Sequence, residues 1–128
     1  MKILGIDHGD KKIGLAVADM ETKIATPYKI LFNNQNIFED LKNICTNEDI
    51  DKIVIGVPKG LQGNESEQMS NVLNFISKLR EEINIEVIEQ DEKLTSSQAG
   101  KLLQGTKSKG QDDDVAAMLI LQGYLDKL

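Results

Sequence analysis

The stretch KILGIDHGDKKIGLAVAD, residues 2–19, decides the fold of this chain. Its two apolar runs, residues 2–7 and 12–18, lie on either side of the connection Asp7-His8-Gly9-Asp10, and this pattern predicts two antiparallel strands joined by a tight turn. An acid at the end of a nearly all-apolar strand loses hydration energy unless it finds a partner, so Asp7 marks a candidate functional site. Its ordinary structural role would be to make the turn ahead of Gly9.

The rest of the chain alternates between strand and helix signals. After a third strand over Thr26 to Phe32, the predicted elements are a helix over 36–45, a strand over 53–57, a helix of about 15 residues that includes Met69 to Leu79, a strand over 83–88, a helix from Thr95 toward Leu103 and a last helix from Asp112. This order predicts an α/β fold. We expect a mixed sheet of five strands, three antiparallel and then two parallel, with helices on its faces and residues 1–128 in a single domain.

The composition fits one compact intracellular domain. A chain of 128 residues with 40% hydrophobic residues is long enough for one core and too short for two comfortable domains. The single cysteine, Cys45, excludes an internal disulfide and indicates a core residue in a reducing compartment. No segment approaches the roughly 20 apolar residues of a membrane span, so we expect a cytoplasmic protein. The net charge of −6 argues against a general polyanion binder, and any nucleic-acid contact must therefore be local.

Acidic residues stand at the boundaries of three apolar elements. Asp7 ends the first strand, Asp91-Glu92 follows the run Ile85 to Ile88, and Asp112-Asp113-Asp114 opens the last helix. Carboxylates 4 Å apart repel by about 4 kcal/mol at an effective dielectric constant near 20. A cluster of Asp7, Glu92 and Asp113 would therefore need a cation, and Mg²⁺ takes such hard oxygen ligands. Taken singly, Asp113 can also cap its helix and Glu92 can be a solvated loop charge.

Four blocks of the sequence resemble one known family. They are GIDHGDKKIGLAVAD (residues 5–19), IGVPKGLQG (55–63), DEKLTS (91–96) and DDVAAMLILQ (113–122), which together span nearly the whole chain in order. These blocks are similar to the YqgF family, which has a ribonuclease-H-like fold and is described as pre-16S rRNA nucleases and formerly as Holliday junction resolvases. The resemblance implies metal-dependent phosphodiester hydrolysis with Mg²⁺ or Mn²⁺.

By position, the resemblance puts the catalytic and metal-binding acids of the family on Asp7, Glu92 and Asp113. Their neighbours Asp91 and Asp114 can substitute for them, and the residues do not decide between the two choices.

Lysines in or beside the same loops form a candidate basic rim for binding the substrate. They are Lys12, Lys59, Lys93, Lys107 and Lys109, with Lys11 next to the first of them. An ordinary solvated role is equally open, because surface lysines are common. Lys12 and Lys93 stand where members of the family often have arginine, and lysine lacks the bidentate fork that grips phosphate.

Two other features stay open between a functional and a structural role. The loop Pro58 to Asn64 has two glycines that let backbone N–H groups approach an anion, but a long connection from a strand to a helix needs glycine for its turns regardless. His8 can be a general acid or can orient a neighbouring group, although a lone loop histidine is more often a plain surface residue.

Three functions fit these features. The first is an endonuclease that processes the 5′ end of pre-16S rRNA in ribosome biogenesis, with a Holliday junction resolvase acting on branched DNA in recombination and repair as its variant. The second is a phosphotransferase or ATPase, but such enzymes close two domains over the nucleotide and this chain supplies at most one. The third is a non-catalytic RNA-binding assembly factor.

The sequence does not distinguish an RNA from a DNA substrate or a monomer from a homodimer. With three Phe and two Tyr, it also shows no aromatic motif for stacking on bases.

Overall fold

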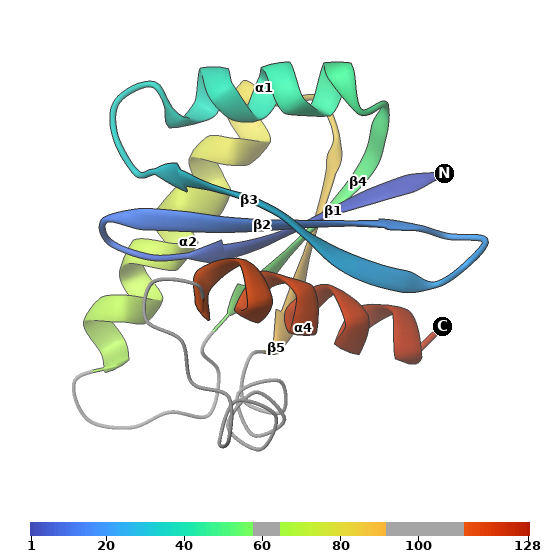
Figure 1. The fold of residues 1–128 in the computed structure, drawn as a ribbon. Helices are drawn as coiled ribbons and strands as arrows, with labels where there is room; N and C mark the ends of the chain where they lie inside the picture. Colours follow the sequence, from blue (N-terminus) through green and yellow to red (C-terminus); the bar gives the residue numbers. More distant parts are fainter. Residues whose placement is uncertain (58–64, 92–111) are drawn as a thin grey trace.

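In the computed structural model, a five-stranded sheet carries helices on both of its faces (Figure 1). The structure describes residues 1–57, 65–91 and 112–128. The strands stand in the order β3-β2-β1-β4-β5, so the first strand lies in the middle of the sheet. The bounds of the elements are β1 Lys2–His8, β2 Lys12–Asp19, β3 Ile24–Phe32, α1 Ile37–Asn47, β4 Ile50–Val57, α2 Glu65–Glu82, β5 Glu86–Asp91 and α4 Asp112–Asp126.

The strand pairing confirms the predicted mixed sheet. β1 with β2 and β2 with β3 are antiparallel, whereas β4 runs parallel to β1 and β5 runs parallel to β4. Short turns join the first three strands, and a helix precedes each of the other two, because a parallel partner can be reached only through a crossover connection. As a result, the carboxyl ends of β1, β4 and β5 lie at one edge of the sheet, which we call the carboxyl edge.

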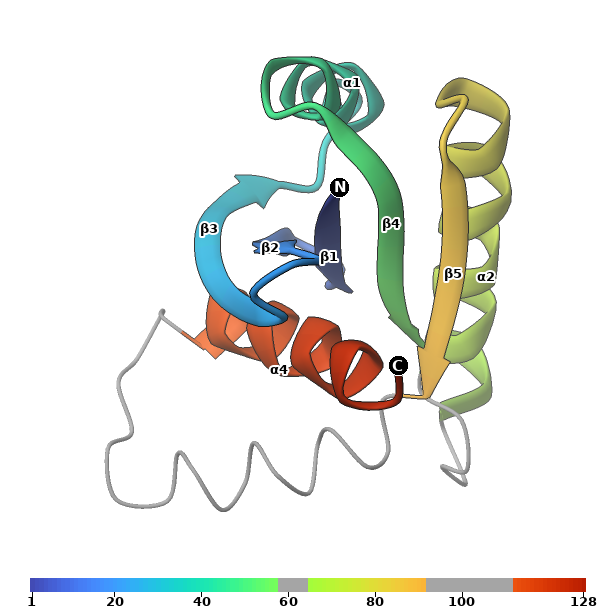
Figure 2. The same ribbon diagram turned by 90° about the vertical axis from the view of Figure 1, so that its right-hand side faces the viewer.

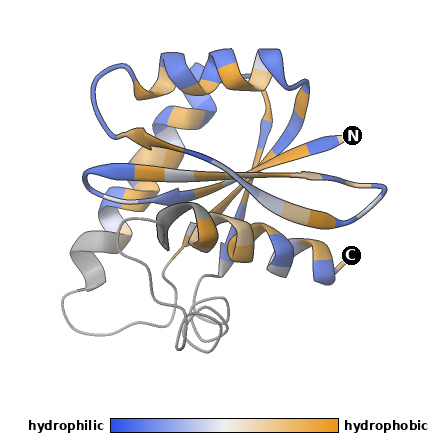
Figure 3. Cartoon of the chain, in the orientation of Figure 1, coloured by the Kyte–Doolittle hydropathy of each residue, from blue (hydrophilic) through white to orange (hydrophobic). Residues whose placement is uncertain are grey.

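A separate hydrophobic core lies on each face of the sheet (Figure 2). One core joins the strands to α1 and α2 through residues such as Ile6, Leu41 and Ile76. The other joins the strands to α4 through residues such as Ile3, Ala16 and Ile120. Figure 3 shows how apolar residues recur along the central strands and alternate with polar residues along α1. No helix in the described ranges is long and apolar enough to cross a membrane.

The last strand begins later than the sequence predicts. The apolar pattern favours a strand over 83–88, but β5 spans Glu86–Asp91. Ile83 instead follows α2. Its N–H donates a hydrogen bond to the Leu79 carbonyl, and its side chain is buried in the core that α1 and α2 cover. The register of β5 is fixed by its pairing with β4, in which Lys52 is opposite Glu86. The alternation of residues within the sequence could not reveal this register. The helix predicted from Thr95 toward Leu103 lies outside the described residues.

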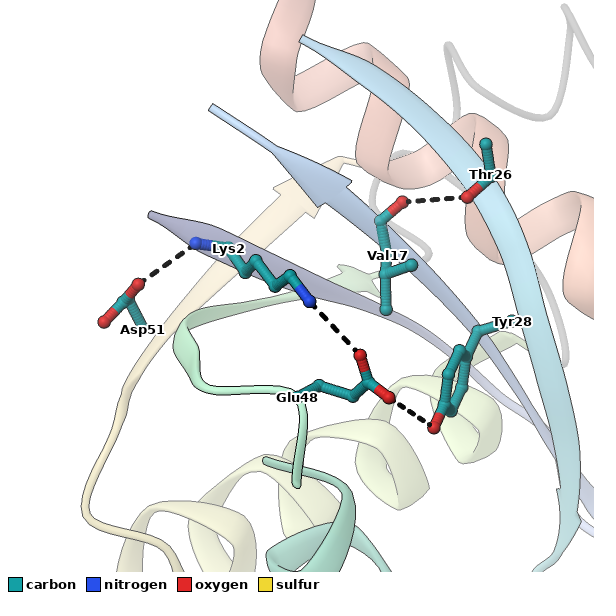
Figure 4. A network of polar contacts seen from close by, with 6 residues as sticks. All are labelled: Lys2, Val17, Thr26, Tyr28, Glu48 and Asp51. Carbon is teal, nitrogen blue, oxygen red and sulfur yellow. Dashed lines mark hydrogen bonds and ion pairs between the residues drawn. The ribbon is translucent and has the colours of Figure 1, made fainter. Parts of the chain in front are cut away.

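Polar contacts around Glu48 tie the opposite, amino-terminal edge of the sheet together (Figure 4). The Lys2 ammonium lies 3.3 Å from one carboxylate oxygen of Glu48, and the Tyr28 hydroxyl donates to the other at 3.2 Å. The backbone N–H of Lys2 donates to Asp51 at 3.0 Å. A partly exposed ion pair of this kind contributes at most about 1 kcal/mol, so its main effect is to hold β1, β3 and the start of β4 in register.

The close packing of α4 on the sheet depends on Gly5 in the middle of β1. A Cβ atom at this position would lie 2.8 Å from the Leu121 Cβ and 3.0 Å from the Ala117 carbonyl oxygen. Both of these atoms belong to the rigid part of α4. The helix therefore comes closer to β1 than any residue with a side chain would permit.

We expect Gly5→Ala to lower the free energy of unfolding by about 1–3 kcal/mol, the usual cost of overpacking a well-packed interface. The added methyl group cannot be accommodated unless α4 moves away from β1. Urea unfolding followed by circular dichroism measures the change. Equal stability of the variant and the wild type would show that α4 does not rest on Gly5.

The core position predicted for Cys45 is confirmed, and its thiol should be unreactive. The side chain is buried, and this burial raises the pKa of the thiol to about 11. The thiol therefore stays protonated at neutral and mildly alkaline pH. We expect iodoacetamide to modify Cys45 quickly in concentrated urea and only very slowly in the native protein, as measured by mass spectrometry. Fast modification of the native protein would contradict the packing of α1.

Candidate active site at the carboxyl edge of the sheet

Asp7 lies near the carboxyl end of the central strand, on the face that α4 covers. Side chains alternate along a strand. Ile3 belongs to the α4 core, whereas Leu4 and Ile6 belong to the core under α1 and α2. Asp7 therefore shares the face of Ile3 and Gly5. The residue is half-buried, so its carboxylate lies at the border between the apolar core and solvent.

Glycines flank Asp7 on both neighbouring strands. Gly14 of β2 is its direct antiparallel partner. On the other side, the parallel register of β1 with β4 sets Gly56 level with Asp7. Val54 of β4 packs in the α4 core, so Gly56 also lies on the Asp7 face. Neither glycine adds a side chain to the face of the sheet that carries Asp7, and both glycines are buried.

Gln90 is the one buried polar side chain among the described residues. It is 4% exposed and stands opposite Gly56 in the pairing of β4 with β5. Its strand neighbour Glu89 turns to the α2 side, where it pairs with Arg80, so Gln90 faces the α4 side like Asp7. Within the described ranges its amide makes no hydrogen bond to another side chain or to a loop backbone. Buried amides are nearly always paired, so this one is suited to a ligand.

The direction of α4 follows from Gln122 in its carboxyl-terminal half. The amide oxygen of Gln122 accepts a hydrogen bond from the Ala25 N–H at 3.0 Å, and its amide nitrogen donates to the Lys23 carbonyl at 2.9 Å. The start of β3 pairs with the end of β2, which in turn pairs with the start of β1. The helix therefore runs antiparallel to β1, and its first turn lies toward the carboxyl end of that strand (Figure 1).

This direction brings the start of α4 toward Asp7. Ala117 contacts Gly5, and position 113 lies one helical turn before Ala117. Asp7 lies two residues beyond Gly5 in the same direction, and both steps cover about 5–7 Å. The start of a helix also carries partial positive charge, which stabilises carboxylates and bound anions nearby.

Of the predicted site residues, the structure describes the side chains of Asp7 and Lys12. The backbones of three others lie in described elements, at the end of β5 and in the first turn of α4, and these are Asp91, Asp113 and Asp114. The remaining predicted residues lie outside the described ranges: Glu92, Lys59, Lys93, Lys107 and Lys109. In the described ranges, no three His, Cys, Asp or Glu residues form a group that could hold a metal ion. The convergence of the three acids stays a prediction.

Lys12 shares the Asp7 face at the same edge of the sheet. It opens β2 opposite Phe32 of β3, and both residues are exposed. Ala16 of the same strand packs in the α4 core, so alternation puts Lys12 on the α4 side. Its ammonium can therefore approach a phosphate that lies near Asp7.

His8 points to the face opposite Asp7. Its ring lies 4.8 Å from that of Phe75 on α2, measured between centroids. Burial lowers the pKa of His8, and the nearby charge of Asp10 only partly opposes this effect. The fold therefore separates the histidine from the carboxylate, although the two are adjacent in the sequence.

The donor groups at this edge suit a hard divalent cation. The half-buried carboxylate of Asp7 and the amide oxygen of Gln90, which has no partner in the described ranges, are oxygen ligands of the kind that Mg²⁺ takes. Gln90 could not be found from the sequence, because the predicted last strand ended at residue 88.

Comparisons with known proteins agree with this architecture. The model of the RuvX family, described as Holliday junction resolvase, matches residues 1–127. A protein of Sulfurihydrogenibium sp. named "Putative pre-16S rRNA nuclease" is 42% identical, with 99% of this chain and 91% of the relative covered. Proteins of the same name from Thermoanaerobacter pseudethanolicus and Clostridium botulinum are 36% and 38% identical, over 98% and 100% of this chain and 96% and 98% of the relatives.

Solved structures of resolvases share the fold at low sequence identity. RuvC of T. thermophilus, in complex with a Holliday junction substrate, has a TM-score of 0.65 at 13% identity and covers 99% of this chain and 94% of its own. The fowlpox virus Holliday junction resolvase has a TM-score of 0.59 at 15% identity, with 100% of both chains covered. The ribonuclease-H-like fold expected from the sequence is thereby confirmed.

We expect Gln90→Leu to raise the free energy of unfolding by about 1–2 kcal/mol in the presence of EDTA, because leucine removes a buried amide that has no partner in the described ranges. The matched control is Gln122→Leu, which removes an amide bonded to Ala25 and Lys23 and should lower the stability by a similar amount. Urea unfolding of both variants measures the two changes. A loss of stability in Gln90→Leu would show that this amide is already paired.

Proposed function

This chain belongs to the RuvX family, which is the YqgF family that its four sequence blocks resemble, and we propose that it is a nuclease that hydrolyses phosphodiester bonds at the 5′ end of pre-16S rRNA. The observation that carries the proposal is the position of Asp7. It lies at the carboxyl edge of the sheet, between two glycines and on the side of the first turn of α4. A role in ribosome biogenesis follows from this substrate.

The names of the relatives favour rRNA over branched DNA. Three relatives at 36–42% identity carry the pre-16S rRNA nuclease name over nearly their whole length. The family description names Holliday junctions instead, and the resolvase structures share the fold alone. A resolvase that cuts a four-way junction therefore stands as the second candidate, with the same residues at its site.

We assign the metal-binding role to Asp7, Glu92 and Asp113, with Mg²⁺ or Mn²⁺ as the ion. When bound, such an ion activates water and stabilises the leaving oxygen of a phosphodiester. The half-buried carboxylate of Asp7 supplies oxygen ligands in a place where the apolar strand would otherwise leave it poorly solvated. Gln90 stands opposite Gly56 on the same face as Asp7, and its buried amide would hydrogen-bond a water molecule held by the ion.

The remaining residues of the carboxyl edge bind and orient the nucleic-acid strand. Lys12 neutralises charge on a phosphate close to Asp7, and Lys59, Lys93, Lys107 and Lys109 extend this basic rim. The first turn of α4 adds the partial positive charge of its backbone N–H groups. A local basic rim lets a chain with a net charge of −6 bind nucleic acid. We further propose that residues 1–128 act as a single domain.

We expect Asp7→Asn to abolish cleavage, because the amide keeps the shape of the side chain but removes the charge that attracts the cation. The assay incubates purified protein and Mn²⁺ with a 5′ segment of pre-16S rRNA and, separately, with a four-way DNA junction. Loss of a metal-coordinating catalytic acid should lower the rate by about a thousandfold or more, equivalent to roughly 4 kcal/mol of transition-state stabilisation.

The matched control is Asp49→Asn, the same chemical change at an exposed residue before β4, far from the carboxyl edge. Asp49 has a φ of 54°, which asparagine also adopts, so the control should fold and cleave normally. Cleavage by Asp7→Asn at the wild-type rate would identify a contaminating nuclease. Cleavage of the junction alone would replace rRNA processing by the resolvase activity.

A further inference from the structure

A cavity opens at the carboxyl edge, on the face opposite Asp7. It has a volume of about 300 Å³ and lies between the turn that follows β1, the start of α1 and the outer face of α2. Its lining residues are His8, Asp10, Asn33, Phe38, Asn71, Asn74, Phe75 and Lys78. A cavity of this size is at the lower end of the range of small-ligand sites.

The inner wall of this cavity is aromatic. The rings of Phe38 and Phe75 stack with centroids 5.1 Å apart, and the His8 ring lies 4.8 Å from Phe75. Phe75 is buried, so the half-buried rings of Phe38 and His8 form the accessible part of the wall. The fold thus gathers two of the three phenylalanines of the chain, although the sequence shows no stacking motif. Such a wall accepts the face or edge of a flat ring.

The rim of the cavity carries side-chain amides. Asn71 and Asn74 lie three residues apart on the exposed side of α2, and Asn33 contributes from the segment after β3. An amide offers both a donor and an acceptor, which is how asparagine recognises the edge of a base. Lys78 supplies one positive charge and Asp10 one negative charge, so the lining has little net charge and does not resemble a dedicated anion site.

One wall of the cavity is held in place by hydrogen bonds to the turn between β1 and β2. The Asn33 amide nitrogen donates to the Gly9 carbonyl at 2.8 Å, and its backbone N–H donates to the Lys11 carbonyl at the same distance. Gly9 itself has no room for a side chain, since a Cβ would lie 2.5 Å from the Lys12 carbonyl oxygen. The turn that separates the cavity from Asp7 is therefore fixed.

We propose that this cavity binds one unpaired nucleobase of the strand that is cut, with the ring against the aromatic wall and its edge on Asn71 and Asn74. The proposal rests on the proposed nuclease function and adds a preference for a single-stranded nucleotide near the scissile phosphate. Nucleobase recognition by stacking and by hydrogen bonds to splayed bases is the general mode for single-stranded RNA.

Binding without cleavage tests the proposal. The NMR signals of the Asn33, Asn71 and Asn74 side-chain amides are followed in EDTA while adenosine 5′-monophosphate, ribose 5-phosphate or a hexa-adenylate RNA is added. We expect the mononucleotide and the RNA to shift these signals, the RNA to bind more tightly, and ribose 5-phosphate to leave them unchanged.

The double variant Asn71→Ala, Asn74→Ala removes the rim amides from exposed positions without disturbing the core. It should weaken RNA binding by about three- to tenfold, the effect of losing one or two hydrogen bonds. The control Asn47→Ala makes the same change at an exposed position in the last turn of α1, toward the amino-terminal edge, and should bind as the wild type does.

Three results would overturn the proposal. Equal NMR shifts with ribose 5-phosphate would mean an anion site, and binding of the mononucleotide but not of the RNA would mean a free-nucleotide site. Unchanged RNA affinity in the double variant would exclude the rim amides. Because these measurements need no metal and no cleavage, they stand apart from the Asp7→Asn assay. Failure of the wild-type protein to cleave either substrate, with intact base binding, would refute only the proposed function.

Discussion

The structure is organised around a carboxylate at the end of an apolar central strand. β1 is buried on both faces by two hydrophobic cores, and Asp7 interrupts this apolar surface just before the strand ends. Removing such a charge from water costs free energy unless other groups compensate. The first turn of α4 acts in that direction, because it brings positive partial charge to this edge.

Glycine makes this arrangement possible at several positions, for different reasons. Gly5 lets α4 approach the sheet closely enough for its first turn to reach the level of Asp7. Gly14 and Gly56 flank Asp7 on the neighbouring strands without adding side chains to its face. Gly9 permits the turn that separates the two faces of the edge, so that Asp7 and the aromatic cavity lie on either side of one rigid connection. Small residues thus set the geometry of the site, and the polar residues supply its chemistry.

The sequence predicted most of the fold because its strands are short apolar runs and its helices show clear apolar stripes. It could not predict the start of β5, since Ile83 and Ile85 continue the alternation of the strand while lying in the connection between α2 and β5. That displacement hid Gln90, which is recognisable as a buried amide only once the pairing with β4 is known. Asp7 could be singled out from its neighbours in sequence alone. The grouping of Phe38, Phe75 and His8 could not be predicted from the sequence, because it depends on the packing of three separate elements.

The central claim is that Asp7, Glu92 and Asp113 share a divalent ion at the carboxyl edge of the sheet. The most direct measurement is an anomalous difference map from crystals of the wild-type protein grown with MnCl₂ and measured near the manganese absorption edge. The account predicts a manganese peak within coordination distance of carboxylate oxygens of all three residues. A map in which the three side chains lie on separate surfaces, or in which manganese binds elsewhere and leaves Asp7 without a metal, would contradict it.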